Sequence, residues 1–121
     1  MTKADLISIE PVPKEDGTPI MEIKFAKVAR WTPKTLLQKQ IEVTEWLQFL
    51  EDCFQQFKDE NHTIKPGFLS VEHAKTQVNL IGEGTHSFSI PKNKWKRFVE
   101  EQAEKLLLNG IISVGEVKSD N

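Results

Sequence analysis

Two segments of the sequence repeat the same residue pattern at an offset of 49 positions. In each, an aliphatic residue that ends a strand-like run is followed by a W-x-x-F helix start, another aliphatic residue and two acids. The matched positions are Ile41, Thr44, Trp46, Phe49, Leu50, Glu51 and Asp52 in the first segment and Ile90, Asn93, Trp95, Phe98, Val99, Glu100 and Glu101 in the second. Because strand-like runs precede both segments, the repeat predicts a duplicated β-β-β-α unit.

Each repeated segment predicts an amphipathic helix. The first has apolar residues at spacings of three and four from Trp46 to Phe57, and we expect its acids, Asp52 among them, to face solvent. Thr44 is the expected N-cap. The second helix repeats this spacing and should end at Asn109-Gly110, where glycine suits a left-handed conformation.

Short runs of β-branched or alternating residues predict the strands. In the second run, Met21, Ile23 and Phe25 alternate with polar residues, so we expect their face to be buried. The alternation then weakens, which predicts a bulge near Ala26, and Thr32-Pro33-Lys34 should break the strand. The runs cover residues 6–12, 20–29, 37–43, 68–73, 77–81 and 86–90, with 111–114 as a candidate last strand.

Length and composition indicate one domain at residues 1–117, followed by a tail at 118–121 that we expect to be disordered. The chain is 38% hydrophobic and 28% charged, values typical of a soluble globular protein. It has no apolar run long enough to span a bilayer and no apolar segment of a secretory signal. The single cysteine, Cys53, excludes an internal disulfide. We therefore expect a cytoplasmic protein.

The histidines, glycines and acids of this sequence do not show the spacing of known catalytic or metal-binding motifs. The histidines, His62, His73 and His86, lack the spacing of metal ligands. Gly82-Glu83-Gly84 has an acid where a phosphate would sit, so it predicts a hairpin loop. The sequence shows no catalytic triad and no paired carboxylates, so we expect no enzyme, no metal and no cofactor.

Cations are concentrated in residues 23–40. This segment has five cations and no acid, whereas the whole chain has a net charge of −2, so the remainder carries −7. Cations neutralise phosphates, and an exposed indole stacks on bases, as in single-stranded nucleic-acid binding. The alternative is a solvated strand face with Trp31 packed over the hairpin end. The expected single-stranded-DNA-binding residues are Lys24, Lys27, Arg30, Trp31, Lys34 and Lys39.

A second group of cations begins the second predicted helix. Positive charge there opposes the helix dipole, and an anionic partner would explain it. The alternative is a solvated helix face, and one candidate on the neighbouring strands, Phe68, is equally expected in the core. The additional candidates for binding single-stranded DNA are Phe68, His73, Lys75, Lys92, Lys94, Lys96 and Arg97.

Three pieces of the chain support a resemblance to a known family. They are the hairpin ADLISIEPVPKEDGTPIMEIKFAKVARW, the run NHTIKPGFLSVEHAKTQVNLIGEGTHSFSIP and the helix NKWKRFVEE. Together they resemble the small early-expressed single-stranded DNA-binding proteins of lactococcal phages, over essentially the whole length. The resemblance implies a variant oligonucleotide-binding (OB) fold and a homo-oligomer, a dimer or tetramer. It also implies sequence-independent binding of single-stranded DNA in phage DNA replication or recombination in the host cytoplasm, with a phage single-strand annealing protein as a partner.

The expected fold is therefore α+β and rich in strands. We expect a variant OB fold, with a curved sheet or partial barrel and two amphipathic helices. The alternative is a duplicated βββα sheet like that of Whirly-type single-strand binders, which the repeat favours. The alternative function is a non-enzymatic protein-interaction module, such as a phage inhibitor of a host protein, which would use the acidic helix faces.

Overall fold

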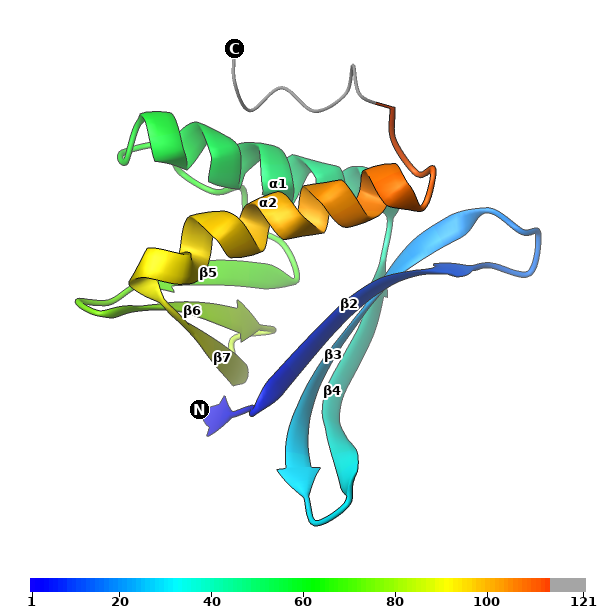
Figure 1. Ribbon diagram of the computed structural model, residues 1–121, viewed down its shortest axis with the longest axis horizontal. Coiled ribbons are helices and arrows are strands. Elements are labelled where there is room, and N and C mark those ends of the chain that lie inside the picture. The colour runs from blue at the N-terminus through cyan, green and yellow to red at the C-terminus, as the bar shows by residue number, and fades with distance from the viewer. Residues whose placement is uncertain (114–121) are drawn as a thin grey trace.

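The computed structural model describes residues 1–113 and contains two β-sheets and two helices, an α+β fold composed mostly of strands. The two helices lie side by side and cover one side of the sheets (Figure 1). The elements in chain order are β1 (Thr2–Lys3), β2 (Leu6–Pro13), β3 (Pro19–Ala29), β4 (Thr32–Ile41), α1 (Val43–Lys58), β5 (Leu69–His73), β6 (Gln77–Gly82), β7 (His86–Pro91) and α2 (Lys92–Leu108). Neither helix is long and apolar enough to cross a membrane within the described part of the chain.

The two halves of the chain have the same order of elements. Strands β2, β3 and β4 form an antiparallel meander that leads into α1, and β5, β6 and β7 form a second meander that leads into α2. Strand β1 pairs in parallel with β7. This order is the one that the sequence repeat predicts. The variant OB fold is not confirmed, because no hydrogen-bonded strand pair joins the two sheets among residues 1–113.

The repeat extends to the packing of the aromatic rings. Trp46 stacks on Phe49 with ring centroids 5.3 Å apart and an interplanar angle of 13°. Trp95 stacks on Phe98 at 5.8 Å and 15°. Each helix thus presents the same pair of large rings, and burying each ring removes roughly 150–250 Å² from water.

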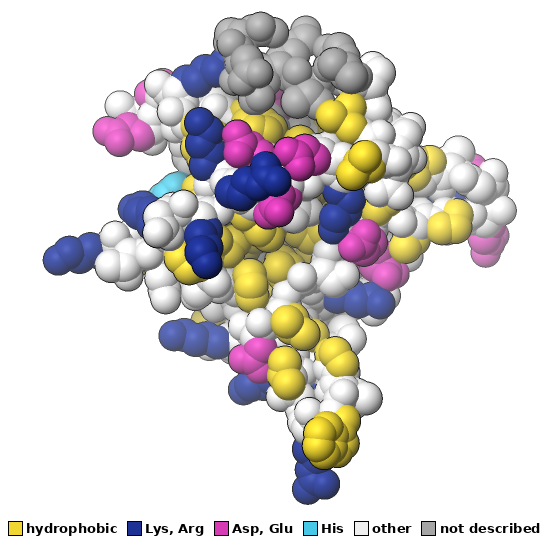
Figure 2. Space-filling view, in the orientation of Figure 1, with side chains coloured by type: hydrophobic (Ala, Val, Ile, Leu, Met, Phe, Trp, Pro, Cys, Tyr) yellow, Lys and Arg dark blue, Asp and Glu magenta, His cyan; other side chains and the backbone are white. Residues whose placement is uncertain are grey.

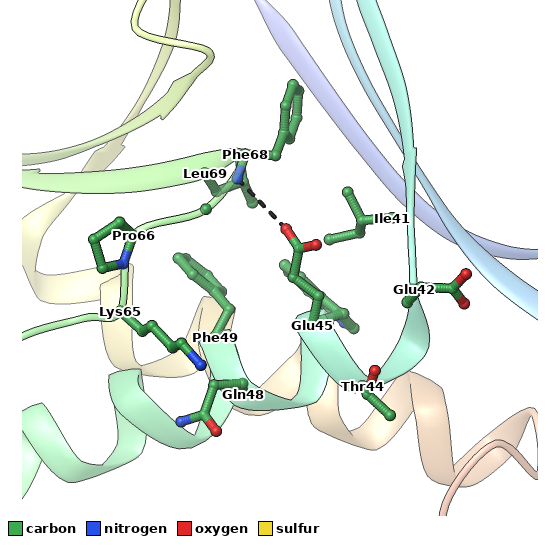
Figure 3. Close-up of a pocket in the computed structure, with 12 residues that line it drawn as sticks. Ile41, Glu42, Thr44, Glu45, Gln48, Phe49, Lys65, Pro66, Phe68 and Leu69 are labelled. Atoms are coloured by element: carbon green, nitrogen blue, oxygen red, sulfur yellow. Dashed lines mark hydrogen bonds between the residues drawn. The ribbon is translucent and has the colours of Figure 1, made fainter.

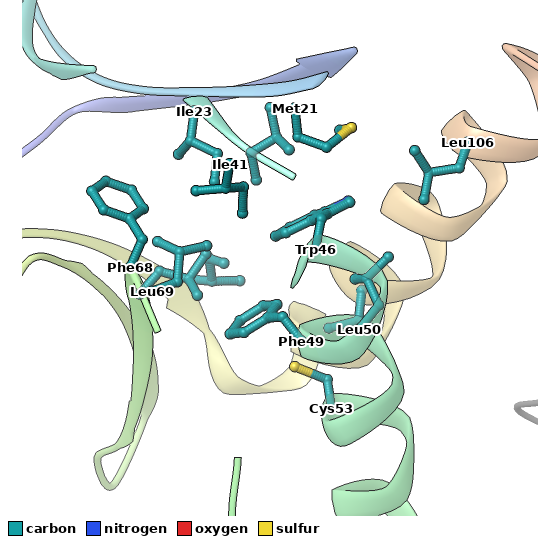
Figure 4. Packing of buried hydrophobic residues seen from close by; sticks show 14 of the residues in the cluster. Met21, Ile23, Ile41, Trp46, Phe49, Leu50, Cys53, Phe68, Leu69 and Leu106 are labelled. Atoms are coloured by element: carbon teal, nitrogen blue, oxygen red, sulfur yellow. The ribbon is translucent and has the colours of Figure 1, made fainter. Parts of the chain in front are cut away.

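The core lies between the helices and the inner faces of the sheets. Met21, Ile23 and Phe25 are almost fully buried, which confirms the predicted buried face of this strand. Trp46 extends from α1 toward the first sheet, with Leu106 of α2 on its other side (Figure 4). The burial of these large side chains holds the first sheet against both helices.

The first sheet differs from the prediction at one point and confirms it at another. Thr32-Pro33-Lys34 does not break the strand, because β4 begins at Thr32. Pro33 is tolerated there because β4 is an edge strand, where the missing N–H is not needed by a neighbour. The register shifts between Phe25 and Ala26, which confirms the predicted position of a bulge, but the extra residue is Leu36 on β4 and not a residue of β3.

The ends of the helices partly follow the sequence pattern. The N-cap of α1 is Glu42 and not Thr44, and no side chain caps this end. At the end of α2, Gly110 has the predicted left-handed conformation, with φ 71°. Its N–H donates to Leu107 O at 3.1 Å, and the Ile111 N–H donates to Leu106 O at 2.9 Å, which closes the helix.

Three further predictions concern the C-terminal region and the face of α1. Residues 111–113 do not form a strand, because they follow the helix cap without pairing to a sheet. Residue 114 and the tail at 118–121 lie outside the described residues. The expectation that Asp52 faces solvent is wrong: its side chain is buried.

Candidate nucleic-acid interface

Strands β3 and β4 continue beyond the rest of their sheet as a two-stranded ribbon. The first residue of β2, Leu6, pairs with Ala26, so β3 has only β4 as a neighbour after that position. Every residue from 27 to 35 is exposed, and we call this segment the arm. It points away from both helices at the bottom of Figure 1. Nothing in residues 1–113 buries this segment, so its side chains are available to a partner.

The tip of the arm carries two side chains that do not help the fold. The pair Ala29–Thr32 closes a two-residue loop that consists of Arg30 and Trp31. Arg30 has a φ of 55°, a left-handed conformation that glycine or asparagine adopts at lower cost. Trp31 is 95% exposed, so the alternative that it packs over the hairpin end is wrong. Hydrophobic and Lys or Arg side chains lie together at this tip in Figure 2.

Two lysines face each other on the arm. Lys27 on β3 is paired in register with Lys34 on β4. Like charges at directly opposite positions destabilise a strand pair. Among residues 1–113, neither lysine has a carboxylate within 4.0 Å. The register places Lys39 on the same face of the sheet, opposite Ile23. The arm therefore carries positive charge that no described carboxylate balances.

Lys24, the fifth cation of this stretch, lies on the other face of the sheet. It is paired in register with Gln38 and forms an ion pair with Glu22 at 3.3 Å. Glu22 also accepts hydrogen bonds from the side chains of Gln38 and Gln40. The hydrogen bond from Gln40, together with Lys24, lowers the pKa of the Glu22 carboxyl group. Lys24 thus belongs to a local polar network and not to the positive face of the arm.

Most cations near the start of α2 already have partners. The Lys92 ammonium group donates to Ala74 O at 2.8 Å, and Lys96 lies 5.9 Å from the centre of the Phe57 ring. Arg97 pairs with Glu104 at 3.1 Å and with Glu101 at 3.9 Å. Lys75 and Lys94 are exposed, and neither forms an ion pair within residues 1–113. This second group therefore offers less free positive charge than the arm.

Two further candidates do not present the groups that binding would need. Phe68 is buried and packs edge-to-face on Phe25 at 6.4 Å, as the alternative interpretation expected. The His73 ring is hydrogen-bonded to the Gln56 side chain at 2.9 Å. Partial desolvation, followed by the charge of Lys92, lowers the pKa of His73, which favours the neutral ring over the cation that a phosphate would attract.

A groove of about 540 Å³ lies between the start of α1 and the segment that leads into β5 (Figure 3). Two carboxylates, Glu42 and Glu45, line it together with one cation, Lys65. A Glu45 oxygen accepts a long hydrogen bond from the Phe68 N–H at 3.5 Å. Because carboxylates repel phosphates, this groove is a poor site for a nucleic-acid backbone.

Asp5 supports the base of the arm, and the sequence analysis did not identify it. Its carboxylate accepts a hydrogen bond from the Val28 N–H at 3.0 Å, and its own N–H donates to Ala26 O at 2.8 Å. These bonds occupy backbone groups of β3 just beyond the first residue of β2, where β2 no longer pairs with β3. An acid just before a strand is too common to predict this role.

Comparisons with known proteins identify no family for this chain. No protein-family model, no curated protein and no solved structure matches this chain. Within residues 1–113, no three histidine, cysteine, aspartate or glutamate side chains are grouped so that they could hold a metal ion.

Proposed function

We propose that this protein binds single-stranded DNA without catalysing a reaction and without sequence preference. One observation carries the proposal: a fully exposed tryptophan sits at the tip of a ribbon whose opposed lysines have no carboxylate partner in the described chain. An exposed aromatic ring beside unpaired cations is the combination with which single-stranded nucleic-acid binders stack bases and follow the phosphate backbone.

In the proposed mechanism, cations bind the phosphates and an aromatic ring stacks on a base. Lys27, Lys34 and Lys39, with Arg30 at the tip, neutralise phosphates along the strand and release their counterions. Trp31 stacks on a base, which contributes about 1–3 kcal/mol and does not depend on base identity. Lys24 contributes less, because Glu22 already balances its charge. Lys75 and Lys94 are candidates for a secondary contact.

For the finer fold we propose the duplicated βββα arrangement, like that of Whirly-type binders, in place of the OB variant. Two meanders, each followed by a helix with the same Trp–Phe stack, support this assignment. The resemblance to the lactococcal phage proteins supports the same function and a homo-oligomer that acts in phage replication or recombination. Several arms in one oligomer would raise the effective concentration along a strand.

Tryptophan fluorescence tests this proposal directly. Trp46 and Trp95 are 1% and 4% exposed, so Trp31 is the indole that an added oligonucleotide can reach. We expect oligo-dT to quench fluorescence at low salt and the quenching to reverse as salt is added. The Trp31→Phe variant should lose this signal and still bind in a gel-shift assay.

A negative result would favour the alternative function. If oligo-dT neither quenches fluorescence nor shifts in a gel at low salt, the arm does not bind single-stranded DNA. The protein-interaction module would then be the better proposal.

A further inference from the structure

We infer that the arm acts as a wedge at the boundary between single-stranded and double-stranded DNA, with the Trp31 ring inserted against the last base pair. This inference rests on the proposed function and names a more specific substrate, a DNA junction. It follows from three features of the arm: its width, the spacing along the strands between the loop and the lysine pair, and the two different faces of the ribbon.

The width of the arm fits a groove of duplex DNA. Beyond Ala26 the arm has two strands only, since β2 begins opposite that residue. Two paired strands lie about 4.8 Å apart. The major groove is about 12 Å wide and admits a two-stranded ribbon. All residues from 27 to 35 are exposed, so no part of the chain between residues 1 and 113 blocks this approach.

The spacing along the arm matches the depth of a groove. The pair Lys27–Lys34 lies three positions behind the Arg30–Trp31 loop on each strand. At about 3.3 Å per residue, this is about 10 Å. The grooves of B-DNA are about 7.5–8.5 Å deep. When the tip of the arm reaches the level of the bases, the backbone positions of Lys27 and Lys34 therefore lie near the rim of the groove, close to the phosphates.

The ribbon has two chemically different faces near its tip. Lys27 and Lys34 occupy one face, and the next pair, Val28 and Pro33, occupies the other because side chains alternate along a strand. Val28 is 56% exposed. Apolar side chains beside a ring suit insertion between bases, which DNA-bending proteins achieve with apolar wedges. One face thus contacts phosphates and the other contacts unstacked bases.

A junction is a better substrate than continuous duplex for a wedge of this size. Inside a duplex, the ring could enter only by separating two stacked base pairs, and its own stacking on one base would return only part of that cost. At a junction, the last pair already has one open face, so the ring can stack there without separating two stacked pairs. The stacking of one tryptophan ring is therefore sufficient to favour binding at a fork, but it is insufficient to open a continuous duplex.

The test uses forked DNA that carries 2-aminopurine at the last paired position, together with oligo-dT and a blunt duplex. We expect the protein to bind the fork more tightly than either control and to change the 2-aminopurine fluorescence. Trp31→Ala should reduce affinity for the fork by about tenfold more than affinity for oligo-dT, and Trp31→Phe should retain most of the difference. Lys14→Gln, which removes a cation at the opposite hairpin, should leave the preference for the fork unchanged.

The outcomes separate this inference from the proposed function. If Trp31→Ala weakens binding to the fork and to oligo-dT by the same factor, or if the 2-aminopurine signal persists in that variant, the wedge is refuted and single-strand binding stands. If the protein fails to bind oligo-dT at low salt, the proposed function itself fails.

Discussion

Lys27 and Lys34 lie directly opposite each other on β3 and β4, at a position where a stable hairpin would pair opposite charges. Within the described residues, no carboxylate relieves their repulsion. This pair is unfavourable for the isolated protein and favourable beside an anion. Changes to the two lysines should therefore affect stability and binding in opposite directions.

The first prediction concerns these lysines. Lys27→Gln or Lys34→Gln should leave the melting temperature unchanged or raise it, because either change removes the repulsion. Each should also weaken binding of oligo-dT and make the slope of log affinity against log salt shallower by about 0.7, the value of one phosphate contact. Titrations at several salt concentrations give the slope, and thermal unfolding gives the stability.

Lys24→Gln is the matched control for this prediction, because it removes the same charge from the other face of the sheet. We expect it to alter the salt slope by less than either arm lysine does. An equal effect of all three changes would mean that binding responds to net charge and not to the arm.

The second prediction compares two tryptophans with opposite burial. Trp31→Ala should weaken binding of oligo-dT by roughly 5- to 150-fold, the equivalent of about 1–3 kcal/mol of stacking. Its free energy of unfolding should change by less than about 0.5 kcal/mol, as for other exposed sites. Trp46→Ala should instead lower the free energy of unfolding by about 3–5 kcal/mol, because this ring is 1% exposed.

Urea unfolding and fluorescence anisotropy with a labelled oligonucleotide measure the two effects separately. Substantial destabilisation by Trp31→Ala would show that the ring packs against the protein in solution, and both the stacking role and the wedge would then lose their basis.

The third prediction concerns the support of the arm by Asp5. Asp5→Ala removes the acceptor of the Val28 N–H, which is 3.0 Å away in the structure. We expect faster hydrogen exchange at Val28 and a modest loss of affinity for DNA, since the base of the arm becomes less ordered. The Ile23 amide, deeper in the same strand, serves as an internal control and should keep its protection.

The fourth prediction tests the contact between the two sheets at Gly82. A Cβ atom at this position would lie 2.6 Å from Cε1 of Phe25 and 3.0 Å from a methyl carbon of Leu37. Gly82→Ala should therefore lower the free energy of unfolding by about 1–3 kcal/mol, because the added methyl group overpacks this contact. Combining it with Phe25→Leu should recover part of this loss, measured by chemical denaturation of the single and double variants. If the two losses simply add, the proposed clash does not exist.

The local features of this chain could be predicted from its sequence. The buried face of β3 and the apolar sides of both helices follow from the spacing of residues such as Ile23 and Trp46, because periodicity acts within one element. The exposure of Trp31 depends on where β2 begins relative to β3, which is a long-range register. Asp52 shows the same limit: periodicity places it on the solvent side of the helix, but the segment that follows α1 folds back and covers it.

The fifth prediction follows from the partners of Asp52. Burial alone would raise the pKa of this carboxyl group, but hydrogen bonds from His62, the Lys65 N–H and Gln48 outweigh it, and the pKa is lowered from its ordinary value. A lowered pKa means that the carboxylate stabilises the fold fully above the unfolded value of about 3.9, and that this contribution disappears as the pH falls through the lower folded value.

Asp52→Asn should therefore have a lower free energy of unfolding than the wild type at neutral pH, and this difference between the two proteins should shrink below about pH 4. Urea unfolding across this pH range measures the deficit. A deficit that stays constant at every pH would show that the carboxylate's charge contributes nothing and that only its shape matters.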